Sequence, residues 1–195
     1  MTETTPKKTR GARRSEDSRT AILKATREEL IENGWRKFSV DRVAKRARAS
    51  KQTIYRWWPS IGTICVEAAL ELIPEGSGSG RDATEKIAEL IAPVEQALRV
   101  GSGHAVLHGA LVAACDEKEA GDRWRMWQRE HIRMPLRNIL AEIASKNVIR
   151  RDFDVDLAMD ILIGPIVHRV VLLRAPLPEG FSGRQAEAMI KQLAP

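Results

Sequence analysis

Apolar residues recur along this 195-residue chain at the 3.6-residue spacing of an α-helix, and short breaks rich in Gly, Pro and Ser separate the runs. No stretch alternates apolar and polar residues over a β-branched run, which is the pattern of a half-buried strand. The sequence therefore predicts an all-α protein without internal repeats. Its apolar content of 43% and charged content of 30% are those of a globular protein and exclude global disorder.

The breaks divide the chain into two groups of expected helices. Those of the front part cover roughly 15–33, 40–47, 51–58 and 60–73, and Ser39, Ser50 and Ser60 can cap the last three. Those of the rear part cover roughly 82–100, 104–115, 118–145, 154–174 and 182–193. Pro135 should kink the helix over 118–145 because it lacks an amide hydrogen. The Gly- and Ser-rich segment 74–80 between the groups indicates either a change of unit or a mobile loop.

Positive charge is concentrated at the front of the chain. Residues 1–60 hold 16 Lys and Arg against 7 Asp and Glu, whereas residues 61–195 hold 16 against 19. A basic module joined to a mildly acidic body favours a polyanionic partner, of which a phosphate backbone is the commonest. The alternative is a tail that is basic only for solubility.

Residues 39–58 match the geometry of a helix-turn-helix, in which a short helix, a tight turn and a second helix follow one another. Val43 of the first helix can brace Ile54 of the second. The second helix then presents Lys51 and Gln52 near its N-terminal end, which is the end that reaches base edges in a major groove. Gln pairs with adenine, and Arg or Lys with guanine, so the segment predicts contacts with DNA.

A fairly specific set of residues surrounds this segment. It reads Ile22-Leu23-x-Ala25, Gly34, Phe38-Ser39-Val40-x-x-Val43-Ala44-x-x-Ala47 and Ser50-Lys51-x-Thr53-Ile54-Tyr55-x-x-Trp58. With these residues, 19–72 resembles the DNA-binding domain of the TetR family of transcriptional repressors. Residues 152–193 resemble one subgroup of that family more weakly.

The resemblance implies a homodimer that binds a palindromic operator in double-stranded DNA and is released by a small-molecule effector. It implies a three-helix helix-turn-helix DNA-binding domain at 15–60 and a helical ligand-binding and dimerisation domain at 61–195. Residues 1–14 before them are polar and rich in Thr, Lys and Arg, a composition that predicts a disordered basic tail. The alternative function is a helical small-molecule-binding protein whose basic front docks another protein or an anionic membrane.

The expected DNA contacts lie on the second helix of the motif and on the helix and turn before it. They are Ser39, Arg42, Arg48, Ser50, Lys51, Gln52, Thr53, Tyr55, Arg56 and Trp57. By resemblance, Tyr55 contacts backbone and base edge, and Trp57 lies against phosphate. Two positions depart from the family pattern, because Arg48 replaces the usual Gly of the turn and Ile61 replaces a usual Lys. A left-handed backbone at Arg48 would cost about 1 kcal/mol.

Two further sites are expected in the rear part. The dimer face is expected along one side of the 154–174 helix and on the last helix, and its candidates are Leu157, Ile161, Gly164, His168, Val171, Phe181 and Met189. Burial inside the monomer is the alternative for these residues. An aromatic and polarizable group is the candidate effector pocket, and it comprises His104, His108, Leu111, Trp124, Trp127, His131 and Met134. A core or surface role is the alternative for each of them.

Motifs for catalysis, metals and cofactors are weak or missing. His104 and His108 could bind a metal from one side of a helix, but the sequence suggests no third ligand. The run Asp152-x-Asp154-x-Asp156 is followed by Leu157, where a calcium loop requires Gly. Capping by Asp154 or Asp156 explains the acidic run better. We therefore expect no enzyme, no metal site and no cofactor.

The cysteines and the hydropathy indicate the compartment. Cys65 and Cys115 form neither a disulfide framework nor a metal knuckle, and no apolar run approaches the length that spans a bilayer. The expectation is a cytoplasmic protein with reduced thiols and no membrane partner.

Overall fold

The computed structural model describes residues 10–99 and 101–195, with side chains from residue 15 onward. The described part is helical and contains no strand, so the prediction of an all-α protein is confirmed. The helices are α1 (Arg10–Asn33), α2 (Val40–Ala47), α3 (Lys51–Trp57), α4 (Ile61–Leu70), α5 (Ala83–Arg99), α6 (Gly103–Asp116), α7 (Lys118–Gln128), α8 (Met134–Ser145), α9 (Val155–Val167) and α10 (Phe181–Gln192). A short 3-10 helix, η1 (Trp35–Lys37), follows α1.

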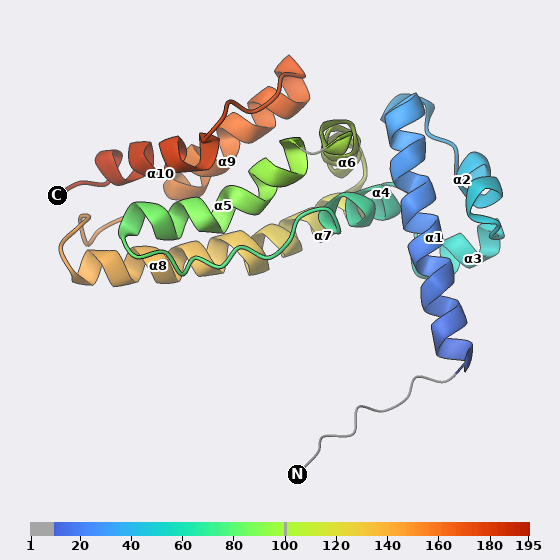
Figure 1. The fold of residues 1–195 in the computed structure, drawn as a ribbon, viewed down its shortest axis with the longest axis horizontal. Helices are drawn as coiled ribbons and strands as arrows, with labels where there is room; N and C mark the ends of the chain where they lie inside the picture. The colour runs from blue at the N-terminus through green and yellow to red at the C-terminus, as the bar shows by residue number, and fades with distance from the viewer. Residues whose placement is uncertain (1–9, 100) are drawn as a thin grey trace, which may run out of the picture.

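Helices α1 to α3 form a head at one end of the molecule, and α5 to α10 form a body on the other side of α1 (Figure 1). The head has its own apolar centre, because Ile22 of α1, Val43 of α2, Ile54 of α3 and Trp58 just beyond α3 are each at most 1% exposed. Such burial of one apolar stripe per helix is what holds short helices together.

Helix α1 begins earlier than the sequence predicts. Its backbone is helical from Arg10 onward, five residues before the expected start at Ser15. Residues 10–14 therefore belong to α1 and not to the tail expected over 1–14. Residues 1–9 lie outside the described part. The expected stop at Asn33 is confirmed, because Gly34 follows with a φ of 67°, a left-handed value that a side chain would disfavour.

Helix α4 joins the head to the body. Residues 62–69 are all buried, and the helix contacts α1 on the head and both α6 and α7 in the body. Its N-terminus is capped by Ser60 and Thr63, as the sequence predicts for Ser60. Leu30 of α1 also packs directly on α6, where a Cβ added at Gly109 would lie 2.7 Å from the Leu30 side chain. The two parts therefore share one continuous core.

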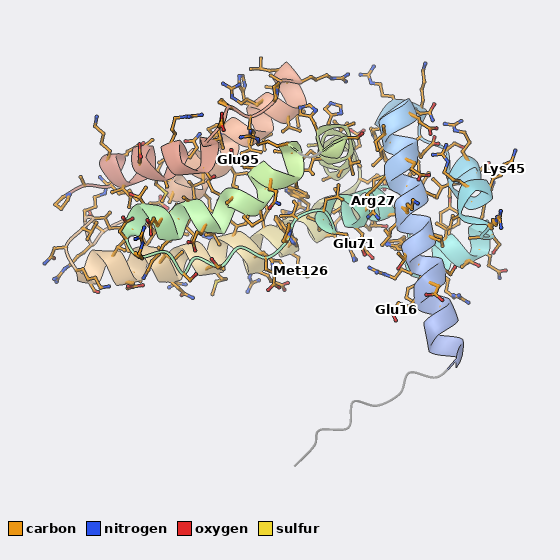
Figure 2. The ribbon with its side chains drawn as sticks, viewed as in Figure 1. Glu16, Arg27, Lys45, Glu71, Glu95 and Met126 are labelled. Atoms are coloured by element: carbon orange, nitrogen blue, oxygen red, sulfur yellow. The ribbon has the colours of Figure 1, made fainter. Side chains whose placement is uncertain are left out.

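Ion pairs reinforce this junction. Glu67 of α4, only 7% exposed, accepts hydrogen bonds from Arg19 of α1 and Arg123 of α7. One turn further, Glu71 pairs with Arg19 at 3.0 Å and with Arg27 at 3.2 Å (Figure 2). Carboxylates of α4 therefore connect arginines of the head and of the body.

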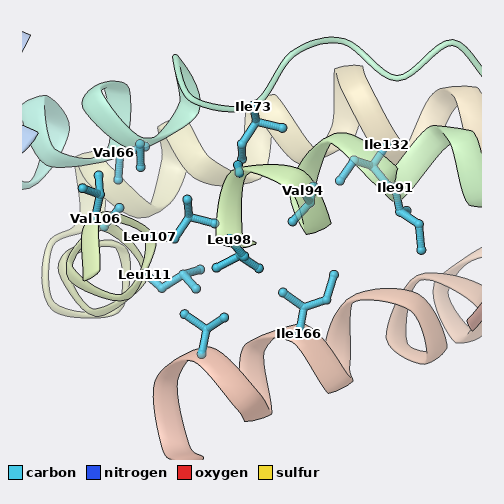
Figure 3. Packing of buried hydrophobic residues seen from close by; sticks show 14 of the residues in the cluster. Val66, Ile73, Ile91, Val94, Leu98, Val106, Leu107, Leu111, Ile132 and Ile166 are labelled. Atoms are coloured by element: carbon cyan, nitrogen blue, oxygen red, sulfur yellow. The ribbon is translucent and has the colours of Figure 1, made fainter. Parts of the chain in front are cut away.

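The body packs α5 against α8 on one side and against α10 on the other (Figure 1). Its centre is filled by aliphatic side chains from α5, α6, α9 and the segments next to them (Figure 3). Glu95 of α5 caps α10 from the side, because its carboxylate accepts the backbone N–H groups of Phe181 at 3.2 Å and Ser182 at 2.8 Å.

Two prolines coincide with changes of helical winding. The predicted kink at Pro135 takes the form of a π turn over Arg129–Arg133, in which the Met134 N–H donates to Arg129 O, five residues back. A second π turn over His168–Leu173 follows Pro165 in α9. Proline lacks an amide hydrogen, so one bond of the hydrogen-bond ladder is lost near it. Pro93 has the same effect on donors, yet α5 stays α-helical through it.

The segment 74–80, where the sequence predicts a change of unit or a mobile loop, packs against α5 as a connector. A Cβ at Gly76 would collide with the backbone of Leu90 in α5. The Ser77 hydroxyl donates to the Glu89 carboxylate at 2.6 Å, and the Ser79 N–H donates to it at 3.1 Å. The glycines of the segment 74–80 allow its backbone to approach α5 closely, which the composition alone does not reveal.

Among the described residues, no helix is both long enough and apolar enough to cross a membrane.

Candidate nucleic-acid interface

The turn before α3 fixes the direction of that helix. Arg48 ends α2 in the left-handed region, at φ 51° and ψ 39°, a conformation that Gly adopts more easily than a residue with a side chain. Ser50 then caps α3, as predicted, because its hydroxyl accepts the Thr53 N–H at 3.0 Å. Ser39 is different, since its side chain makes no cap bond and its N–H donates to Glu29 at 3.2 Å.

Helix α3 exposes the side that the sequence predicts. Ile54 faces the core and Thr53 is half-buried. Tyr55 and Trp57 are 45% and 41% exposed, and Lys51, Gln52 and Arg56 are also exposed. Helices α2 and α3 lie on the side of α1 that faces away from the body (Figure 1). The outer face of α3 is therefore open to a large partner.

Several cations of the head are held by carboxylates of the same domain. Arg42 donates from Nε to Glu29 Oε1 at 2.9 Å, and Glu29 is fully buried. Arg46 lies 2.6 Å from Glu32. Arg42 is thus engaged with α1, although its side chain stays 48% exposed, and the DNA contact that the sequence predicts for it stays a prediction. Its role in positioning α2 against α1 is the one that these bonds support.

On the reading helix itself, Lys51 lies 2.5 Å from Asp41 of α2. The hydrogen bond and the charge of that carboxylate raise the pKa of Lys51. Lys51 therefore stays protonated, and both side chains remain exposed, so the pair can open when a phosphate approaches.

Three cations on the outer side of the head have no carboxylate partner among the described side chains, namely Lys45, Arg48 and Arg56. Arg48 and Arg56 are among the DNA contacts predicted from the sequence, whereas Lys45, which projects from α2 away from the body, is not (Figure 2). Helical spacing was the available signal, because Lys45 follows Asp41 by one turn on the exposed side of α2.

Comparison with known proteins agrees with this geometry. Residues 22–68 match the family model described as bacterial regulatory proteins, tetR family. Residues 82–189, more than half of the chain, match the model of the tetracyclin repressor-like C-terminal domain. The chain belongs to the TetR family. It is therefore a DNA-binding transcriptional regulator of a non-enzymatic family.

Relatives match this TetR protein over most of their length. An uncharacterized HTH-type transcriptional regulator of Bacillus subtilis, YdeS, is 29% identical over 84% of this chain and 83% of its own. The DNA-binding transcriptional repressor TetR of Mycobacteroides abscessus is 28% identical over 91% of this chain and 94% of its own.

Solved structures share the fold. The TetR family transcription regulator SCO0332 superposes with a TM-score of 0.64 at 22% identity, over 92% of this chain and all of that one. A TetR transcriptional regulator from Agrobacterium tumefaciens gives 0.59 at 17% identity, over 90% and 92% of the two chains.

The dimer candidates of this TetR protein fall into two groups. Leu157, Gly164 and His168 are exposed along α9 and the π turn after it, and Ile161 and Val171 are half-buried. A Cβ added at Gly164 would meet no atom within 4 Å. The other two candidates, Phe181 and Met189, are buried.

Phe181 and Met189, at 5% and 0% exposure, lie in the core of the monomer. The structure corrects the expectation for these two, because their side chains pack inward on the body and present almost no surface to a partner.

The effector candidates do not share one cavity. Trp124, Trp127 and Leu111 line a small space of about 20 Å³, within the aliphatic core of Figure 3. Leu111 and Trp124 also line an open cleft of about 670 Å³ against α9. His131 stacks on Trp127 with ring centroids 5.4 Å apart. Organic ligands usually occupy several hundred Å³, so the aromatic site is closed in this conformation.

The remaining effector candidates lie elsewhere. Met134 is 43% exposed on the surface. His104 and His108 line a separate cleft between the head and the body. The single pocket expected from the sequence is therefore divided between two places.

Proposed function

We propose that the protein is a homodimeric repressor that inserts α3 of each subunit into successive major grooves of a palindromic operator. The observation that carries the proposal is the exposed side of α3, with Gln52, Tyr55 and Arg56 open on the side of the head away from the body. Two-fold proteins bind half-sites that lie about 34–36 Å apart, or a multiple of that distance.

Each part of the interface has a chemical role in this proposal. Gln52 and Arg56 read base edges, since an amide pairs with adenine and a guanidinium with guanine. Lys51, Thr53, Tyr55 and Trp57 hold the phosphate backbone or the rim of the groove. The free cations Lys45 and Arg48 add phosphate contacts from α2 and the turn.

Dimerisation is proposed through the exposed side of α9. Open space at Gly164 allows a helix of a second subunit to approach closely, and Leu157 and His168 flank it on the same element and its extension. Leu172, at 72% exposure, extends the apolar surface, which a monomer in water does not favour.

Release by an effector is proposed to act through α4. An effector that enters between Trp124 and Trp127 has to displace α7, because the space there is too small. Helix α7 holds α4 through Arg123 and Glu67, and Glu117 just before α7 accepts the Gly62 N–H at 2.9 Å. A coupling of about 1–3 kcal/mol lowers operator affinity about 5–150-fold.

The test begins with selection of bound duplexes from a random pool. The selected palindrome should bind at least about 10³-fold more tightly than a scrambled duplex at fixed salt. Equal affinity for the two duplexes contradicts the proposal and supports a basic front that docks another protein or an anionic membrane.

Variants separate base contacts from phosphate contacts. Gln52→Ala should relax specificity at one base pair and cost about 1–3 kcal/mol, whereas Lys45→Ala should weaken all sequences and reduce the salt slope by about one. Arg137→Ala, an exposed substitution on α8, is the control and should change neither quantity.

A further inference from the structure

An open cleft of about 660 Å³ separates the head from the body. Its head side consists of the end of α1 and η1, and its body side of α6 together with Val171 and Arg174 at the end of the second π turn. The cleft is distinct from the small space between Trp124 and Trp127, because no residue lines both. Its volume is in the range of small-molecule sites.

Basic side chains from three elements line this cleft. Arg36 and Lys37 belong to η1, His104 and His108 to α6, and Arg174 follows the π turn. Arg36, Lys37 and Arg174 have no carboxylate partner among the described side chains. The one acidic residue of the lining, Glu32, is already paired with Arg46 at 2.6 Å. The lining therefore carries a net positive charge, and a carboxylate next to it, Asp116, accepts the Trp35 indole N–H.

The two histidines add hydrogen-bonding capacity that is unused. They are four residues apart and so share one side of α6. The Nε2 atom of His104 is buried and has no hydrogen-bond partner. Burial, and then the positive charges of Arg174 and His104, lower the pKa of His108. Buried polar atoms are normally satisfied, so this unpaired nitrogen beside the cleft is a candidate hydrogen-bonding group for a ligand.

The lining also contains apolar side chains, among them Leu30, Ile31, Trp35 and Val112. Ile31 is 44% exposed, and Val112 of α6 lies on the opposite wall. Trp35 is held in place because its Nε1–H donates to Asp116 Oδ2 at 2.7 Å. An indole that is fixed in this way offers a flat face to an aromatic ring. The cleft thus combines a cationic side with an aromatic and aliphatic side.

We propose that this cleft binds a small aromatic carboxylate, with the carboxylate at Arg174 and the α6 histidines and the ring against Trp35 and Ile31. Guanidinium–carboxylate hydrogen bonds are among the strongest available for such recognition. The site is separate from the aromatic effector site proposed above and does not depend on it. A ligand here would contact head and body at once, and so would fix the angle between them.

Calorimetric titration of the full chain with 2-naphthoate tests the proposal, with 2-naphthamide as the neutral analogue and inorganic phosphate as the anion without a ring. Naphthoate should bind one molecule per chain, and at least about tenfold more tightly than either comparison compound. Equal binding of the amide refutes the role of the charge, and equal binding of phosphate refutes the role of the ring.

Arg174→Gln should weaken naphthoate binding at least about tenfold. The same change at Arg137, exposed on α8, is the matched control and should leave the affinity unchanged. Equal affinities in the two variants overturn the assignment. Proton NMR gives an independent readout, because naphthoate should shift the ring signals of His104 and His108 and leave those of His131 and His168 in place. These measurements contain no DNA, so their failure leaves the proposed operator binding intact.

Discussion

Arg48 is a residue under local strain at the centre of the DNA-binding head. Its φ of 51° lies where a side chain crowds the backbone, and it sits between α2 and α3, whose relative angle the turn determines. Glycine adopts this conformation without that crowding, so the arginine is retained at a cost in stability. Its exposed guanidinium gives a reason, because no carboxylate among the described side chains holds it and it is open to a phosphate.

The prediction is that Arg48→Gly is more stable than Arg48→Ala by about 1 kcal/mol, since both lack the charge but only glycine relieves the backbone. Urea unfolding of the two variants measures the difference. Both should bind operator DNA more weakly than the natural protein and show a smaller salt slope. If Arg48→Gly is no more stable than Arg48→Ala, the backbone at this position is not strained.

Glu95 is a buried carboxylate with a stabilising role in the body. Burial acts to raise its pKa, but hydrogen bonds from Ser182 and Phe181 outweigh that effect and leave the pKa of Glu95 below the ordinary glutamate value. A lowered folded-state pKa stabilises the fold above the unfolded-state pKa, and this contribution is lost as the pH falls through the folded-state value.

We expect Glu95→Gln to destabilise the protein by about 1.5–3 kcal/mol near neutral pH, because the α10 N-terminus loses a charged acceptor. The difference from the natural protein should shrink as the pH falls from about 5 to about 3. Urea unfolding at several pH values measures it, with Glu187→Gln on the exposed side of α10 as the control. A difference in stability that stays constant with pH would contradict the stabilising role of the ionised Glu95 carboxylate.

At the scale of elements, α4 is held by two arginines through one carboxylate. Arg19 of α1 and Arg123 of α7 both bind Glu67, although α1 and α7 belong to different parts of the molecule. Removing either arginine leaves Glu67 with the other, whereas removing both leaves a buried carboxylate without a cation. The two arginines should therefore be coupled energetically.

A double-mutant cycle of Arg19→Met and Arg123→Met should show an interaction energy of about 0.5–3 kcal/mol. Arg27 and Arg123 share no carboxylate, since Arg27 pairs with Glu71, so their cycle should be additive to within about 0.5 kcal/mol. Chemical unfolding supplies both energies. Additivity in the first cycle would show that α1 and α7 act independently on α4.

Helix positions followed from local patterns, but the pairing between helices did not. Periodicity and capping residues located α2, α3 and α4 because those signals lie within each helix. That Arg42 reaches Glu29, or that Gly76 lies on Leu90, depends on how distant segments pack. The outward side of α3 was predictable, whereas the partners that hold Arg42 and the division of the effector candidates between two places were not.

At the scale of the whole molecule, the proposed dimer uses the exposed side of α9, and this face would then set the positions of the two heads. We predict that Gly164→Arg abolishes the dimer while leaving the monomer folded, because Gly164 has open space around it in the monomer. Light scattering during size exclusion should then report the mass of one chain, and operator affinity should fall steeply. Ala141→Arg, on the exposed side of α8, is the control and should stay dimeric. If the Gly164→Arg protein is still a dimer, the exposed side of α9 is not the dimer interface.

The chain contains a single tyrosine, and that tyrosine is Tyr55, 45% exposed on the outer side of α3. A reagent that nitrates phenols consequently has one target in the entire sequence. Bound operator would shield that ring, so the yield of nitrotyrosine, read as yellow absorbance, becomes a direct gauge of occupancy without any engineered label.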